Sequence, residues 1–168
     1  MIVFLGIYAL VSMSNMQESA TEAETSALKY MKQADDLNVA VSEYKAAMYK
    51  MLTADDENKK SVAAADLQKA TATIDKILPE LADGIAFPEK MQETQANWAK
   101  TKNHGDKATN ILQAQGTAAA YDYMMNEMYQ DFHNLDTNTS ELGELELKHA
   151  QDAVATSHAT YESARTTT

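Results

Sequence analysis

A Glu-x-x-His segment and four histidines are the residues of this sequence whose types and spacing could hold a metal ion. Glu146 and His149 lie three positions apart, which places both side chains on one face of a helix, as in di-iron helical bundles. Such a centre needs a second Glu-x-x-His segment, and the sequence contains none. His104, His133 and His158 lack the i, i+4 spacing of a zinc-binding helix. We therefore interpret Glu146 as part of a solvated face and His149 as a polar residue on a helix seam, and we expect no metal and no other cofactor.

Catalytic chemistry and nucleic-acid binding have no support in the sequence. It contains no Cys, no Gly-x-Ser-x-Gly segment and no Gly-rich phosphate loop. The 14 Lys and Arg residues stand against 25 Asp and Glu residues, which gives a net charge of −11, and Arg165 is the one arginine. A protein that binds a phosphate backbone needs a basic surface. We expect neither an enzyme nor a nucleic-acid partner.

Tyrosine and methionine gather in two segments, near residues 44–51 and near residues 121–125. If helices pair in antiparallel fashion, the two segments face each other at the same height. One interpretation is core packing, because Met fills irregular gaps between helices. The other is a ligand pocket with aromatic walls and a few polar groups. The candidate ligand-binding residues are Tyr44, Lys45, Met48, Lys50, Met51, Gln113, Gln115, Thr117 and Tyr121.

The elements that must position these residues are helices. Gly (5) and Pro (2) are scarce, and good helix formers supply much of the chain. Between residues 13 and 51, small or apolar residues recur in an unbroken 3-4 alternation, which predicts a coiled-coil-like seam. Helix signals, among them Pro88 at a helix start and a stop at residues 103–106, divide the chain. The same 3-4 spacing predicts a seam on the last helix through Ala118, Tyr121, Met125, Met128, Phe132, Leu135, Thr139 and Leu142. The helices are expected at about residues 6–53, 56–83, 88–103 and 106–165.

This order of long, short, short and long helices predicts the all-α class and an elongated antiparallel four-helix bundle over residues 14–165. The first helix alone would measure roughly 70 Å. Its alanine-rich seam buries little area per residue, so a single copy would be marginally stable. We therefore expect a dimer.

Residues 1–13 form an apolar run, MIVFLGIYALVSM, that is too short to cross a bilayer, for which about 20 residues are needed. The run could be a buried helix of a soluble bundle or the outer part of a truncated first transmembrane helix. We adopt the second interpretation, with residues 166–168 as the lead-in to a missing second span.

Four segments carry a resemblance to a known family. They are GIYALVSMSNM (6–16), YKMLTADDEN (49–58), GDKATNILQAQG (105–116) and SARTTT (163–168). Together with the helix order, they resemble the first membrane span and the ligand-binding domain of bacterial methyl-accepting chemotaxis proteins. The resemblance implies a periplasmic sensor domain of an inner membrane receptor, homodimeric through helix one and helix four. It also implies that a small organic ligand binds at the membrane-distal end of the dimer interface and that a helix displacement carries the signal across the membrane.

The sequence departs from the aspartate-receptor type of this family at the ligand site. That type holds a dicarboxylate with arginines, and the matching positions here are Val41, Ala46 and Lys50. One Lys cannot replace the two-point guanidinium fork, so we expect a ligand with an apolar or aromatic body and at most one or two carboxylates. Two alternatives stay open: a sensor domain of a histidine kinase or cyclic-dinucleotide enzyme, and a ligand-free structural or protein-interaction bundle.

Overall fold

The computed structural model describes the backbone of residues 2–166, and the side chains of residue 18, residues 21–160 and residues 162 and 163. Helices make up 94% of the described residues, which contain no strand. The elements, in chain order, are α1 (Ile2–Thr53), α2 (Glu57–Ala82), α3 (Pro88–Gln115), α4 (Thr117–Tyr123), the π-helical turn η1 (Met124–Met128) and α5 (Tyr129–Thr166). Because α4, η1 and α5 follow one another without a break, they act as one rod. The predicted all-α four-helix bundle is confirmed.

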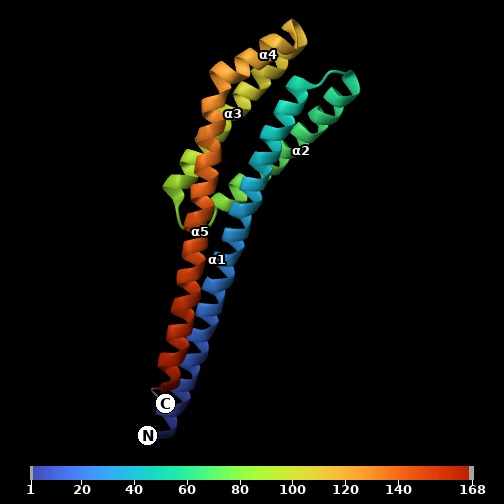
Figure 1. The fold of residues 1–168 in the computed structure, drawn as a ribbon. Helices are drawn as coiled ribbons and strands as arrows, with labels where there is room; N and C mark the ends of the chain where they lie inside the picture. Colours follow the sequence, from blue (N-terminus) through green and yellow to red (C-terminus); the bar gives the residue numbers. More distant parts are fainter. Residues whose placement is uncertain (1, 167–168) are drawn as a thin grey trace.

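The two long rods form the axis of the molecule (Figure 1). α1 and α5 lie side by side, and both chain ends are at the same end of this pair. α2 packs along α1 and α3 packs along α5, whereas α2 and α3 touch each other little. We call the end farthest from the chain termini the distal end. There the α1–α2 tip and the α3–α4 tip diverge, and below the loop of residues 83–87 only α1 and α5 continue, as a two-helix stalk (Figure 1).

The seam predicted along the first helix is the core face of α1 from Ala27 to Met51, whereas Ala23, also predicted on the seam, is exposed. Its buried members are Ala27, Ala34, Leu37, Val41, Tyr44, Met48 and Met51. A second buried stripe, Ala40, Ala47 and Leu52, broadens this face. The extra stripe follows from the packing, since α1 contacts α5 on one side and α2 on the other.

The predicted helix end at residues 103–106 is wrong, because α3 continues to Gln115 and the turn lies at Gly116. Gly116 has φ +88°, the left-handed conformation that glycine tolerates best. The buried residues of α3 keep the 3-4 spacing through the predicted stop: Met91, Thr94, Trp98, Thr101, Gly105 and Ala108. Gly105 therefore does not end the helix but lets it approach α1, since a Cβ there would lie 2.0 Å from the Tyr44 hydroxyl oxygen.

The fourth rod begins at Thr117 instead of residue 106, and its predicted seam fails near its start. Tyr121 and Met125 were expected on the seam, yet they are 42% and 40% exposed. Ala120 and Met124 are buried in their place. The cause is η1, whose wider turn displaces the buried stripe by one position relative to a continuous α-helix. From Met128, the last residue of η1, onward the predicted seam is correct, with Met128, Phe132, Leu135, Thr139 and Leu142 buried.

The two ends of the chain are described only in part. Residues 2–13 belong to α1, but their side chains, residue 1, and residues 167 and 168 of the expected lead-in lie outside the described residues. Over the part of the chain that is described, no helix is both long and apolar enough to cross a membrane.

Gly105→Ala tests the close approach of α3 and α1. The new methyl group would collide with the buried Tyr44 ring, so we expect the free energy of unfolding to fall by about 1–3 kcal/mol. Gly143→Ala is the matched control, because a Cβ at Gly143 meets nothing within 4 Å. There the better helix propensity of Ala should raise the stability by up to about 1 kcal/mol. Urea unfolding followed by circular dichroism measures both, and equal effects of the two substitutions would contradict the packing described here.

Candidate functional site

The nine predicted ligand-binding residues do not meet in one pocket within the chain. Tyr44, Met48 and Met51 are 3%, 0% and 4% exposed and belong to the core. Four others are exposed on the α3–α4 side of the distal end, namely Gln113, Gln115, Thr117 and Tyr121. Within one chain the two tips diverge, and the Tyr and Met side chains of α1 point into the bundle, so the predicted ligand site at the dimer interface stays a prediction.

Core packing is therefore the correct interpretation for the aromatic and Met residues of α1. The Tyr44 ring stands edge-on to the Trp98 ring, with 5.0 Å between centroids and 82° between planes. It also lies 6.0 Å from the Phe132 ring, on which Tyr49 stacks at 6.5 Å. Burial raises the pKa of the Tyr44 hydroxyl above its ordinary value. These rings join α1, α3 and α5 in the upper half of the bundle.

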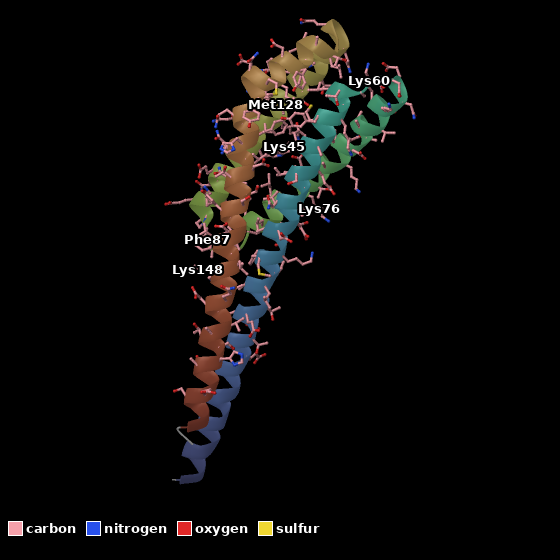
Figure 2. All side chains as sticks on the ribbon, viewed as in Figure 1. Lys45, Lys60, Lys76, Phe87, Met128 and Lys148 are labelled. Atoms are coloured by element: carbon pink, nitrogen blue, oxygen red, sulfur yellow. The ribbon has the colours of Figure 1, made fainter. Side chains whose placement is uncertain are left out.

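Two polar contacts cross between α1 and α5. Lys45, another predicted ligand residue, forms an ion pair and hydrogen bond with Asp136, and both side chains are about one-third exposed. Lys45 lies between the two helices in Figure 2. One turn farther from the tip, Thr139 donates a hydrogen bond to the side-chain oxygen of Asn38 at 3.1 Å. Lys45 is thus occupied inside the chain rather than presented to a ligand.

His104 connects the two sides of the π-turn. Its Nδ1 lies 2.7 Å from the Tyr123 hydroxyl oxygen, just before η1, and its Nε2 lies 3.2 Å from a carboxylate oxygen of Asp131, just after it. Burial, with smaller effects of the neighbouring Glu127 and Asp131 carboxylates, raises the pKa of Tyr123. The sequence predicts only a surface or seam histidine here, and no sequence spacing signals this contact because His104 comes from α3.

Asp75 on α2 receives two donors from α3. The Trp98 indole N–H donates to one of its oxygens at 2.8 Å, and the Lys102 ammonium donates to the other at 2.5 Å. Burial opposes ionisation of Asp75, but the two donors and the Lys102 charge outweigh it and lower the pKa of this carboxyl. This contact holds α2 to α3, which otherwise touch little.

One cleft of about 530 Å³ opens at the α1–α2 tip. Its lining residues come from the end of α1, the turn and the first three turns of α2: Lys50, Thr53, Ala54, Asp55, Asn58, Lys59, Val62, Ala63 and Asp66. Lys50 is the predicted ligand residue that lines it, at 3.9 Å from Asp66, and Lys59 lies 2.6 Å from Asp55. The cleft combines cations, carboxylates and a short apolar wall, which suits a small charged molecule with an apolar part.

Sequence reasoning misses most of this cleft for a local reason. The segment around residues 53–58 predicts a helix start, and the structure confirms it, with the Asp56 side chain accepting a hydrogen bond from the Lys59 backbone N–H at 2.7 Å. A helix cap explains these polar residues fully, so no sequence signal marks them as the wall of a cleft. Of the three positions that match the aspartate-receptor arginines, Val41 is buried, whereas Ala46 and Lys50 are exposed.

The burial of Glu146 and His149 is the reverse of the prediction, which placed Glu146 on a solvated face and His149 on a helix seam. Glu146 was expected in a solvated face, yet its side chain is completely buried, while the His149 side chain is 47% exposed. No group of three or more potential metal ligands occurs in the described part of the chain.

A family model described as a four helix bundle sensory module for signal transduction matches residues 1–161. The match covers nearly the whole chain and all six elements of the structure. No curated protein matches the chain.

Proposed function

Because this chain belongs to the family of four-helix-bundle sensory modules for signal transduction, we propose that it is the extracytoplasmic sensor domain of a chemoreceptor. The family match over residues 1–161 carries this proposal. In it, the segment is periplasmic, the full-length receptor is anchored in the inner membrane, and the domain binds its ligand without changing it chemically. A small organic ligand binds at the distal end and displaces α1 relative to α5.

The arrangement of the rods supports this direction of signalling. Among the described elements, α1 and α5 are the ones that run from the distal end to the end where the chain termini lie (Figure 1). A change at the α1–α2 tip can therefore reach the other end only through this pair. Coupling over such a distance requires a rigid element with more than one discrete arrangement, and two long packed helices provide one.

The cleft at the α1–α2 tip supplies the chemistry for a carboxylate ligand. Lys50 offers an ammonium group, whereas Lys59 is paired with Asp55. Ala54, Val62 and Ala63 offer an apolar wall. The contact between Lys50 and Asp66 is long and exposed, and such pairs contribute at most about 1 kcal/mol. A ligand carboxylate can therefore compete for Lys50, while the apolar body of the ligand covers the Val62 side chain, which is 56% exposed.

A second copy of the chain completes the site in this proposal. Large apolar side chains are exposed on the two helices expected to pair, Val39 on α1 and Tyr121, Met125 and Tyr129 on the α4–η1–α5 rod. Pairing through these faces would bury them and bring Gln113, Gln115 and Thr117 of the α3–α4 tip near the interface. These exposed polar residues then contribute hydrogen-bond donors and acceptors to the ligand.

Calorimetry with single carboxylates tests the ligand site. Benzoate, phenylacetate and succinate cover the expected range of apolar bodies and charges. Lys50→Met should weaken binding of the carboxylate that binds best by about tenfold, or about 1.4 kcal/mol. Lys76→Met, on the exposed side of α2 (Figure 2), makes the same charge change away from the cleft and should leave the affinity unchanged. Equal affinity of the Lys50→Met variant and the wild type, or no binding of any of the three, would argue against this ligand site.

Sedimentation equilibrium tests the dimer. The double variant Met125→Lys, Tyr129→Lys places two charges in the proposed interface and should weaken dimerisation by at least about tenfold, because burying an unpaired charge is costly. The double variant Ala65→Lys, Ala72→Lys is the control, since both residues are exposed on α2, away from the cleft and from the proposed interface. A strictly monomeric wild type, or equal association of the double variant and the wild type, would contradict the proposal.

A further inference from the structure

The loop of residues 83–87, between α2 and α3, packs Ile85 into the core and contacts α5 through the buried carboxyl group of Glu146 and through the Phe87 ring. The Glu146 side chain is completely buried. One of its oxygens accepts a hydrogen bond from the backbone N–H of Ala86 at 3.2 Å. The other, Oε2, is buried and has no hydrogen-bond partner among the described residues. Among the described residues, only one of the two Glu146 carboxyl oxygens therefore has a hydrogen-bond partner, and the side chain has no surface exposed to solvent.

On the α5 side, His149 is the charged neighbour of this carboxyl. Its Nδ1 lies 3.9 Å from Glu146 Oε2, which is too far for a hydrogen bond. The His149 ring stands edge-on to the Phe87 ring of the loop, with 6.1 Å between centroids and 84° between planes. Phe87 lies beside α5 in Figure 2. The loop thus touches α5 through a carboxyl and an aromatic ring.

On the α1 side, the groups nearest the loop are the polar side chains of Tyr30 and Gln33, and the Lys29 ammonium stands 5.2 Å from the centroid of the Tyr30 ring. The Tyr30 hydroxyl occupies the space beside Gly84, where a Cβ would lie 1.8 Å from its oxygen. Gln33 donates to the Glu80 carboxylate, at the end of α2, at 3.4 Å. From α3, Lys90 contacts Glu93 and Glu141 rather than Glu146. No ammonium or guanidinium group contacts the buried carboxyl in the described structure.

The ionised and the protonated forms of Glu146 need different numbers of hydrogen-bond donors around them. An ionised carboxylate needs several donors or water, and here it has one backbone N–H. A protonated carboxyl carries no charge and keeps the acceptor that binds Ala86. Burial raises the pKa of Glu146, and the Ala86 N–H and His149 only partly oppose that rise. When the loop leaves α5, water can reach the carboxyl and satisfy the charge.

We propose that Glu146 is a proton-binding site that controls how firmly the loop of residues 83–87 is docked on α5. The docked state binds the proton more tightly than the undocked state. Docking is therefore strongest at pH values below the ordinary pKa of Glu, and it weakens as the pH rises through the raised pKa of the docked form. A protonated His149 favours the ionised carboxylate and works against this effect from its exposed position.

The position of the loop lets protonation of Glu146 affect the stalk of α1 and α5. The loop lies where the four-helix part of the molecule ends and the stalk of α1 and α5 begins (Figure 1). When the loop leaves α5, the hydrogen bond from the Ala86 backbone N–H to Glu146 is broken. Proton binding then acts on α5, the helix that leads toward the C-terminus, and it does so independently of any ligand at the distal end. This inference does not depend on the proposed ligand site.

Hydrogen–deuterium exchange of the full chain at a series of pH values tests the proposal. After correction for the intrinsic exchange rate, protection of residues 83–87 in the wild type should fall by about tenfold between about pH 4 and pH 8. Glu146→Gln keeps an oxygen acceptor for the Ala86 N–H and removes the titration, so its protection should not depend on pH. Glu144→Gln, an exposed position on the same helix, should behave like the wild type. Protection that is constant or rises with pH in the wild type, or an equal fall in Glu146→Gln, would overturn the proposal.

Carbon NMR of the wild-type protein provides a second test that does not depend on whether Glu146→Gln folds. The Glu146 carboxyl carbon and the Ala86 amide should titrate with the same midpoint, above the ordinary value for Glu. Different midpoints, or a carboxyl midpoint at or below the ordinary value, would overturn the proposal.

Discussion

The polar contacts between α1 and α5 set the register on which the rest of the structure depends. Toward the stalk, the face of α1 has small buried side chains such as Ala27 and Ala34, which offer little shape to distinguish one axial position from the next, whereas nearer the distal end the larger Tyr44 packs against Phe132 of α5. The ion pair of Lys45 with Asp136 forms at one register only. The Thr139 hydroxyl meets Asn38 at the same register, although it can also donate to the Leu135 carbonyl of its own helix. Polar pairs at helix seams are best known for this role, in which they specify an arrangement more than they stabilise it.

The remaining elements are attached to these two helices. α2 packs on α1 and α3 packs on α5, so the relative position of α1 and α5 also decides how far apart the two distal tips lie. The π-helical turn η1 interrupts the regular α-helix of the rod formed by α4, η1 and α5. His104 of α3 contacts Tyr123 before this turn and Asp131 after it. A displacement between the rods must therefore break a small number of defined contacts.

Sequence reasoning succeeds where apolar residues alone mark the buried face. The α1 seam, the helix start near Asp56 and the Pro88 start of α3 follow from spacing and capping chemistry. It fails where polar or small residues are buried: Thr94, Thr101 and Gly105 conceal the continuation of α3, and Glu146 reads as a surface residue. The π-turn has no sequence signature at all. For the candidate site, Lys50 is predictable as a distal cation, but its cleft depends on the packing of α1 against α2, which spacing does not reveal.

The distance between spin labels on α1 and α5 tests the register claim most directly. The chain contains no Cys, so Ser26→Cys and Gln151→Cys, both at exposed stalk positions, provide unique attachment sites. In the wild-type background we predict one narrow distance distribution from double electron–electron resonance. Replacing Lys45 by Met and Asp136 by Leu should keep the bundle folded, since apolar residues often substitute for an ion pair without loss of stability, but should broaden or split the distribution. A distribution that stays single and equally narrow in that variant would contradict the account.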